Sequence, residues 1–145
     1  MENLLISACL CGENCRYDGK NNLIVQIDEL RKKYNLIIVC PEILGGLSTP
    51  RVPAEIIGGK VINKIGKDVT YEFELGAKKS LELAKKYNCK IALLKDKSPS
   101  CGSKKIYDGT HRGKLINGRG FTAKILLENN IKIYGEENVN ELLKN

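Results

Sequence analysis

Short apolar runs alternate with amphipathic segments along this 145-residue chain, and this alternation limits the folds available to it. Uninterrupted apolar runs of strand length are typical of buried β-strands. Apolar positions three or four residues apart are typical of helices that cover a core. Strands that alternate with helices in this way favour a mostly parallel sheet with helices packed on both faces.

The expected strands are apolar runs at residues 3–10, 36–40, 90–95 and 131–135. The expected helices show helical spacing at residues 25–34, 71–87, 121–130 and 137–144. The longest helix should begin at an N-cap, Thr70, and should turn four side chains inward, those of Phe73, Ala77, Leu81 and Ala84. The order of elements predicts an α/β, Rossmann-like three-layer fold that forms a single domain over residues 1–145.

Two long stretches, residues 41–59 and 96–120, contain all four prolines and many glycines and are expected to be irregular. Residues 60–70 lie between an irregular stretch and the longest helix, and are expected to form a short hairpin that turns near residues 64–67. Both irregular stretches begin just after a predicted strand. In a parallel α/β sheet the functional crevice lies beyond these carboxyl ends.

Three cysteines that are far apart in the sequence fall at these strand ends. Cys9 ends the first predicted strand, Cys40 ends the second, and Cys101 lies just past the third in "KSPSCGS". Because the carboxyl ends of parallel strands share one edge of a sheet, we expect the three side chains to meet in one crevice. The alternative is that they are small buried apolar residues, which is the role expected for Cys89 at a helix–strand junction.

The single histidine and the cysteine spacing restrict the metal chemistry. Catalytic zinc usually has histidine among its ligands, and His111 is expected to be exposed. Cys9, Cys15, Cys40 and Cys101 could together hold a structural zinc, although such sites usually use Cys-x-x-Cys pairs, which are absent here. Thiolates scattered over several strand-end loops suit an iron–sulfur cluster better.

Composition and charge limit where in the cell the protein can be located and which partners it can bind. Residues 1–8 do not resemble a secretory signal, and no apolar stretch approaches the about 20 residues that span a bilayer. We therefore expect a cytoplasmic protein with reduced cysteines and no membrane partner. The net charge of +7 comes from lysines that are spread along the chain, which indicates a lysine-rich surface more than a dense nucleic-acid patch.

Five ordered motifs are similar to those of a known family. "SACLCGENCRYDG", "CPEILGGLSTPRVPAEI", "DVTYEFELGA", "KSPSCGSKKIYDGT" and "GRGFTA" resemble the motifs of the thiouracil desulfidase (TudS-like) family over about residues 4–134. The resemblance implies a 4Fe–4S protein that removes sulfur from thiolated pyrimidines without net redox change and releases hydrosulfide. The substrate would be thiouracil, thio-UMP or thiouridine.

The resemblance also implies which residues bind the cluster. Three cysteines, Cys9, Cys40 and Cys101, match the family's ligand positions and would leave one iron open. Cys15 matches a position that is cysteine in many relatives, and is the second-rank ligand candidate. Cys11 departs from the common pattern, in which an apolar residue is usual.

Polar residues beside these motifs are the candidates for catalysis and substrate binding. Glu42 is the expected general base for the attack of water, with a loop cap as its structural alternative. Ser98 and Ser100 are expected to donate hydrogen bonds to the pyrimidine or the water, unless they only form a turn. The expected substrate contacts are Arg16, Tyr17, Asp18 and Arg51, of which the two arginines would hold a phosphate if the substrate is a nucleotide.

Two other classes of protein are compatible with the same cysteines. One is a metal- or cluster-containing module that binds RNA or a protein partner without catalysis, and the other is a cluster carrier. Six tyrosines, two phenylalanines and no tryptophan give little support to a base-stacking platform. The favoured partner is a small thiopyrimidine base or nucleotide, tRNA is less favoured, and the expected assembly is a monomer or a dimer.

Overall fold

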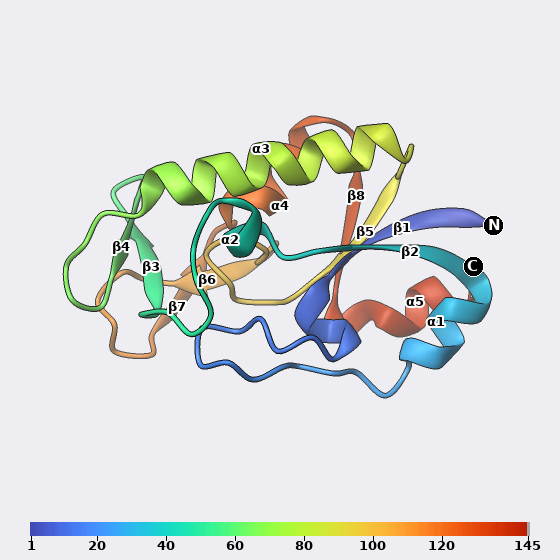
Figure 1. The fold of residues 1–145 in the computed structure, drawn as a ribbon, viewed down its shortest axis with the longest axis horizontal. Coiled ribbons are helices and arrows are strands. Elements are labelled where there is room, and N and C mark those ends of the chain that lie inside the picture. Colours follow the sequence, from blue (N-terminus) through green and yellow to red (C-terminus); the bar gives the residue numbers. More distant parts are fainter. Residues whose placement is uncertain (145) are drawn as a thin grey trace.

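Four parallel strands form the central sheet in the computed structural model, which describes residues 1–144 (Figure 1). Their order across the sheet is β2 (Tyr34–Val39), β1 (Glu2–Ser7), β5 (Ile91–Leu94) and β8 (Lys132–Gly135). Each neighbouring pair is parallel. The predicted α/β fold with a mostly parallel sheet is therefore confirmed.

Helices cover both faces of this sheet. Figure 1 shows α3 (Thr70–Lys86) and α4 (Phe121–Glu128) on one side, and α1 (Ile27–Lys33) and α5 (Val139–Lys144) on the other. Successive residues of β1 alternate between the two cores, since Leu4 and Ile6 pack with α1 and α5 whereas Leu5 packs with α3 and α4. Within residues 1–144 we find no helix of the length and hydrophobicity that a membrane span requires.

The first strand is shorter than predicted and ends at Ser7. The chain then forms a 3-10 helix, η1 (Ala8–Cys11), so Cys9 lies just beyond the strand and not in it. Gly12 ends this turn with a φ of 92°, and its N–H donates to the carbonyl of Cys9. Glycine adopts this left-handed conformation at little cost, which allows the chain to fold back at the edge of the sheet.

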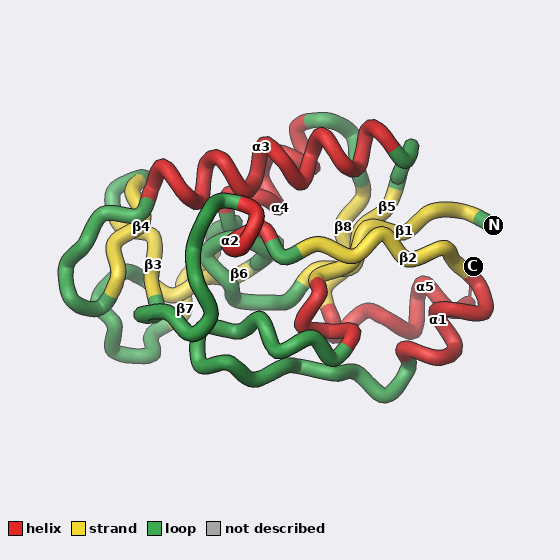
Figure 2. Tube along the Cα trace, viewed as in Figure 1, coloured by secondary structure: helices red, strands yellow, loops and turns green. Residues whose placement is uncertain are grey.

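Both stretches that were expected to be irregular contain short elements (Figure 2). The first holds α2 (Pro41–Leu44) and β3 (Ala54–Ile57), and β3 pairs with β4 (Lys60–Asn63) through a Gly58–Gly59 turn. The second holds the hairpin of β6 (Lys105–Tyr107) and β7 (Leu115–Asn117). A second short 3-10 helix, η2 (Glu136–Asn138), precedes α5.

The expected hairpin over residues 60–70 is present as a short antiparallel contact. The Asn63 N–H donates to the Lys67 carbonyl, the Val69 N–H donates to the Val61 carbonyl, and an antiparallel bridge joins Ile62 to Asp68. The regular ladder of β4, which was not expected, is formed with β3. Gly58 and Gly59 both have positive φ, 57° and 79°, which is the conformation that a tight two-residue hairpin turn requires.

The longest helix confirms its predicted inward face, because Phe73, Ala77, Leu81 and Ala84 are all buried. Its predicted cap is wrong by one residue, since Val69 is the N-cap. The Thr70 hydroxyl instead accepts the Val61 N–H at 2.9 Å and ties the helix to β4.

A contact between α2 and α3 fixes the start of the segment that follows β2. Gly45 faces the backbone of Glu72, and Gly76 faces the carbonyl of Pro41. A Cβ at either glycine would overlap with backbone atoms of the other helix. The two glycines therefore permit the close packing that places α2, and with it Cys40 and Glu42, at the edge of the sheet.

Candidate active site

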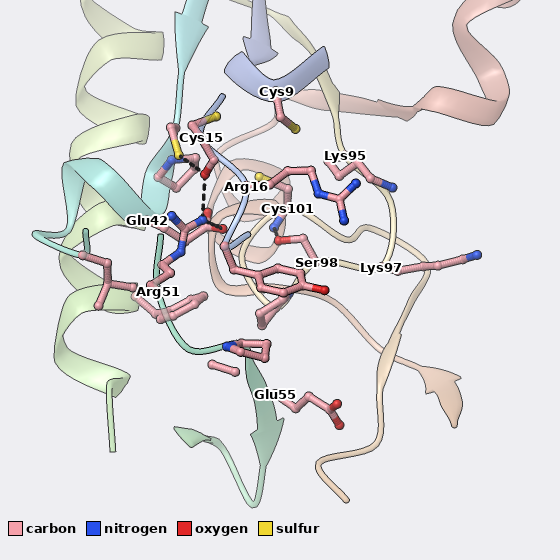
Figure 3. A pocket seen from close by; sticks show the side chains of 18 of the residues that line it. Cys9, Cys15, Arg16, Glu42, Arg51, Glu55, Lys95, Lys97, Ser98 and Cys101 are labelled. Carbon is pink, nitrogen blue, oxygen red and sulfur yellow. Dashed lines mark hydrogen bonds and ion pairs between the residues drawn. The ribbon is translucent and has the colours of Figure 1, made fainter. Parts of the chain in front are cut away.

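A cavity of about 580 Å³ lies beyond the carboxyl ends of the strands. Its volume lies within the range of about 300–1,000 Å³ that is usual for small-molecule sites. Segments that follow β1, β2 and β5 wall one end, and the two hairpins wall the other. We call these the cysteine end, lined by Cys9, Cys15, Cys40 and Cys101, and the hairpin end, lined by Glu55, Tyr107 and His111; Figure 3 shows Glu55 well away from the labelled cysteines.

The structure brings the three predicted ligand cysteines together with Cys15. All four line the cavity, and side-chain hydrogen bonds join Cys15 to both Cys9 and Cys40. Cys11 is half-buried on the other side of η1 and does not line the cavity, and burial raises the pKa of its thiol to about 11. Whether the cysteines bind iron stays a prediction at this point.

The hydrogen bonds of Cys15 divide the cysteines into two kinds. They lower the pKa of Cys9 to about 7, where Asn22 also contributes, and they lower the pKa of Cys40, where the Ile43 N–H also contributes. The same two contacts, together with burial, raise the pKa of Cys15 itself. The pKa values of Cys9 and Cys40 are thus lower than that of an ordinary thiol, whereas the pKa of Cys15 is higher.

Cys101 is the most enclosed of the four. Burial raises its pKa well above the usual value for a thiol, and the negative charge of Glu42 adds to this effect. The hydroxyl of Ser7 opposes it by donating a hydrogen bond to the sulfur at 3.4 Å. An enclosed thiol of this kind gains most from a bound cation, which stabilises the thiolate.

Glu42 faces the cavity from α2 and is held by Arg51. The Arg51 Nη2 atom donates to Glu42 Oε2 at 3.2 Å and to the carbonyl of Cys15 at 2.9 Å (Figure 3). Its Nη1 atom donates to the carbonyl of Ser48. The Arg51 side chain is only 10% exposed. It therefore fastens Glu42 to the loop of Cys15, and its guanidinium is already engaged by protein groups at the position where a phosphate contact was predicted.

The two predicted serines lie in different environments. The Ser98 hydroxyl oxygen lines the cavity and accepts the N–H groups of Ser100 and Cys101, both at 3.0 Å, which leaves its proton free to donate. Ser100 is buried and lies outside the cavity lining, where its hydroxyl bonds with that of Thr122 at 2.7 Å. Of these two serines, only Ser98 lines the cavity and can contact a molecule bound there.

In the "RYDG" segment, Arg16 and Asp18 bind each other, and only part of the segment lines the cavity. Arg16 and Tyr17 line the cavity, but Asp18 does not. Asp18 binds Arg16 at 3.1 Å and accepts the N–H of Lys20, while Arg16 also donates to Asn22 Oδ1 at 3.0 Å. Asp18 is thus placed to orient Arg16, and not to contact a substrate directly.

The hairpin end contains a Glu55–His111 contact that the sequence did not suggest. Glu55 Oε1 accepts the N–H groups of Gly109 and His111, and Glu55 Oε2 lies 3.5 Å from His111 Nδ1. His111 Nε2 lies 3.2 Å from the carbonyl of Ile62. The prediction that His111 is exposed is wrong, because its side chain is only 18% exposed and clamps one hairpin to the other.

The 2-thiouracil desulfurase family model matches residues 4–138. The chain belongs to the 2-thiouracil desulfurase family. A curated relative, the uncharacterized protein YbbK of Bacillus subtilis (strain 168), is 42% identical over 150 residues, which cover 97% of this chain and 99% of the relative. The solved structure of the 4Fe–4S-dependent thiouracil desulfidase TudS matches this chain with a TM-score of 0.92 and 40% sequence identity. The match covers 98% of this chain and 95% of the TudS chain. These findings confirm the resemblance indicated by the five motifs.

The cysteine end of this desulfurase-family chain fits an iron–sulfur cluster in its donor chemistry. Four thiol side chains come from three separate strand ends, and soft thiolates are the usual ligands of such clusters. Two of them, Cys9 and Cys40, have a pKa lower than that of an ordinary thiol. In residues 1–144, no three histidine, cysteine or acidic side chains are arranged to hold a single metal ion.

Proposed function

We propose that this chain is a 4Fe–4S-dependent desulfidase that converts thiolated pyrimidines to their oxo form and releases hydrosulfide. The observation that carries the proposal is the gathering of Cys9, Cys40 and Cys101 beside Glu42 in one cavity large enough for a pyrimidine. Membership of the 2-thiouracil desulfurase family and the similarity to TudS support the same reaction.

In this proposal Cys9, Cys40 and Cys101 hold the cluster. Three thiolate ligands leave one iron without a protein ligand, and that iron supplies a thiophilic Lewis acid to the substrate. Cys15 lines the same cavity but stays off the cluster in this proposal, because a fourth cysteine ligand would leave no iron open to the sulfur of the substrate.

Glu42 is the general base in this proposal. A water molecule adds its oxygen to the ring carbon while Glu42 accepts one of its two protons. The second proton passes to the sulfur as the carbon–oxygen double bond forms and the carbon–sulfur bond breaks, and Glu42 then returns its proton to solvent. The sulfur leaves as hydrosulfide, so one water is consumed and no electrons are exchanged with a donor. Arg51 holds Glu42 Oε2, and among the described residues Oε1 has no hydrogen-bond partner, so this oxygen is available to the water.

Ser98 and the cations of the lining orient the substrate. The free hydroxyl proton of Ser98 can donate to a ring nitrogen or oxygen of the pyrimidine, and Tyr17 offers a half-exposed ring. Lys64, Lys67 and Lys97 line the cavity and make no ion pair within residues 1–144. These lysines, more than Arg16 or Arg51, would meet the phosphate of a thiolated nucleotide.

The test is an anaerobic assay of the reconstituted protein with thiouracil and, separately, with thio-UMP. We expect the oxo pyrimidine and hydrosulfide to form in equal amounts, with no added reductant. Glu42→Gln is the matched control, since it should hold the same iron and release little hydrosulfide. A fully loaded protein that releases no hydrosulfide from either compound would refute the proposed activity.

A further inference from the structure

A serine in the wall of the cavity holds the sulfur of Cys101. Ser7 is the last residue of β1 and is 3% exposed. Its hydroxyl oxygen accepts the backbone N–H of Lys95 at 3.0 Å, and its proton is directed to Cys101 Sγ at 3.4 Å. The N–H of Lys95, the residue after β5, thus fixes the serine rotamer that donates to the sulfur.

An asparagine lies beside Cys9 in a similar way. The backbone N–H of Asn22 donates to the Cys9 carbonyl at 2.9 Å, both residues line the cavity, and the Asn22 side chain lowers the pKa of the Cys9 thiol. Arg16 can only donate hydrogen bonds, and its Nη1 atom donates to Asn22 Oδ1 at 3.0 Å. The Asn22 oxygen must therefore face Arg16, which leaves the Asn22 amide N–H₂ group to donate to the sulfur. Asp18 binds Arg16 from the other side and completes this chain of contacts.

Cys9 and Cys101, two of the three cysteines assigned to the cluster, thus each have a polar side chain from outside the group beside them, and each of these side chains is fixed by a second contact. We propose that Ser7 and Asn22 are positioning residues that orient the sulfurs of Cys101 and Cys9 and lower the electron density on the cluster. This inference rests on the proposed function.

The physical basis is the effect of hydrogen bonds on iron–sulfur clusters. A donor that binds a ligand sulfur withdraws electron density from it and raises the reduction potential of the cluster. The same withdrawal makes an iron a stronger Lewis acid. Removal of either donor should therefore lower the reduction potential and slow desulfuration, even though Ser7 and Asn22 do not need to touch the substrate.

The experiment measures iron content and midpoint reduction potential by anaerobic redox titration of Ser7→Ala, Asn22→Leu and the double variant. We expect full iron content, a lower potential in each single variant, and nearly additive shifts in the double variant, because the two donors share no partner. Ser7→Thr retains the hydroxyl and should stay near the wild-type potential. Ser80→Ala is the matched control, because Ser80 is equally buried but donates to Gly76 within α3.

Two results would overturn the inference: loaded Ser7→Ala and Asn22→Leu proteins with the wild-type potential, or a Ser7→Thr protein shifted as far as Ser7→Ala. If Ser7→Ala does not retain iron, Asn22→Leu provides the same test at another sulfur. A wild-type protein that holds no cluster or releases no hydrosulfide refutes the proposed function. Unchanged potentials beside normal wild-type turnover refute only the role of Ser7 and Asn22.

Discussion

At its cysteine end the cavity is walled by segments that leave the parallel sheet, whereas at its hairpin end it is walled by two small antiparallel ladders outside that sheet. The positions of Cys9, Cys40 and Cys101 follow from where β1, β2 and β5 end. The positions of Glu55 and His111 follow instead from contacts between β3, Ile62 of β4 and the loop after β6. The first end depends on topology, and the second depends on a few side-chain contacts.

This difference suggests that the two ends of the cavity have different functions. Sheet edges are rigid, and a cluster needs ligands held in a fixed arrangement. The hairpin end holds its shape through hydrogen bonds and the Glu55–His111 contact, so it can be altered without disturbing the sulfurs. We therefore expect changes at the cysteine end to alter cofactor content and chemistry, and changes at the hairpin end to alter substrate affinity.

The largest effect is expected from the ligand cysteines. Cys40→Ser and Cys101→Ser should each abolish both iron retention and activity, because the loss of one thiolate leaves the cluster with too few ligands. His111→Ala, at the hairpin end, should retain the wild-type iron content. Iron and acid-labile sulfide analysis after reconstitution checks both outcomes. Equal iron loss at the two ends would remove the distinction between them.

The next largest effect separates chemistry from cofactor binding within the cysteine end. Glu42→Gln should retain the cluster spectrum and lose activity by about 10²–10⁴-fold, the usual contribution of a general base. The measurement is the initial rate of hydrosulfide release per loaded cluster. Unchanged turnover would reject Glu42 as the base and would direct attention to the other polar groups of the lining.

A smaller effect concerns the packing that supports the cysteine end. Gly76→Ala gains about 1 kcal/mol of helix propensity, but its Cβ would overlap with the Pro41 carbonyl. Overpacking typically costs about 1–3 kcal/mol, so we expect a net loss of stability in urea unfolding. Lys79→Ala, on the exposed side of α3, is the control and should change stability by no more than about 0.5 kcal/mol. A Gly76→Ala protein that is more stable than the wild type would show that α2 can move away freely.

The smallest effect is expected at the hairpin end. Glu55→Gln removes the charge that faces His111, and the loosened hairpins should raise KM by up to about tenfold, which corresponds to about 1.4 kcal/mol, with little change in kcat. Glu74→Gln, at an exposed position of α3, is the control. Steady-state kinetics with thiouracil decide the point. A large fall in kcat with KM unchanged would place Glu55 in the chemistry.

The sequence allowed the prediction of one end of the cavity better than the other. Buried strands and an amphipathic helix have clear periodicity, so the sheet and the meeting of Cys9, Cys40 and Cys101 followed from element order. The Glu55–His111 contact could not be predicted, because it depends on the pairing of β3 with β4, which the Gly58–Gly59 turn determines. Side-chain rotamers and local hydrogen bonds could not be predicted from the sequence either. The positions of Ser100 and Asp18 outside the cavity lining were therefore not foreseen.

The central claim is that three of the four clustered cysteines bind the cofactor and that Cys15 does not. The most direct measurement is the iron content of Cys15→Ser beside Cys9→Ser, reconstituted anaerobically under identical conditions. We predict four irons per chain and a normal cluster spectrum for Cys15→Ser, as a 4Fe–4S cluster with three other ligands requires, and no stable cluster for Cys9→Ser. A Cys15→Ser protein without iron beside a Cys9→Ser protein with a full cluster would contradict the assignment and make Cys15 the ligand from this loop.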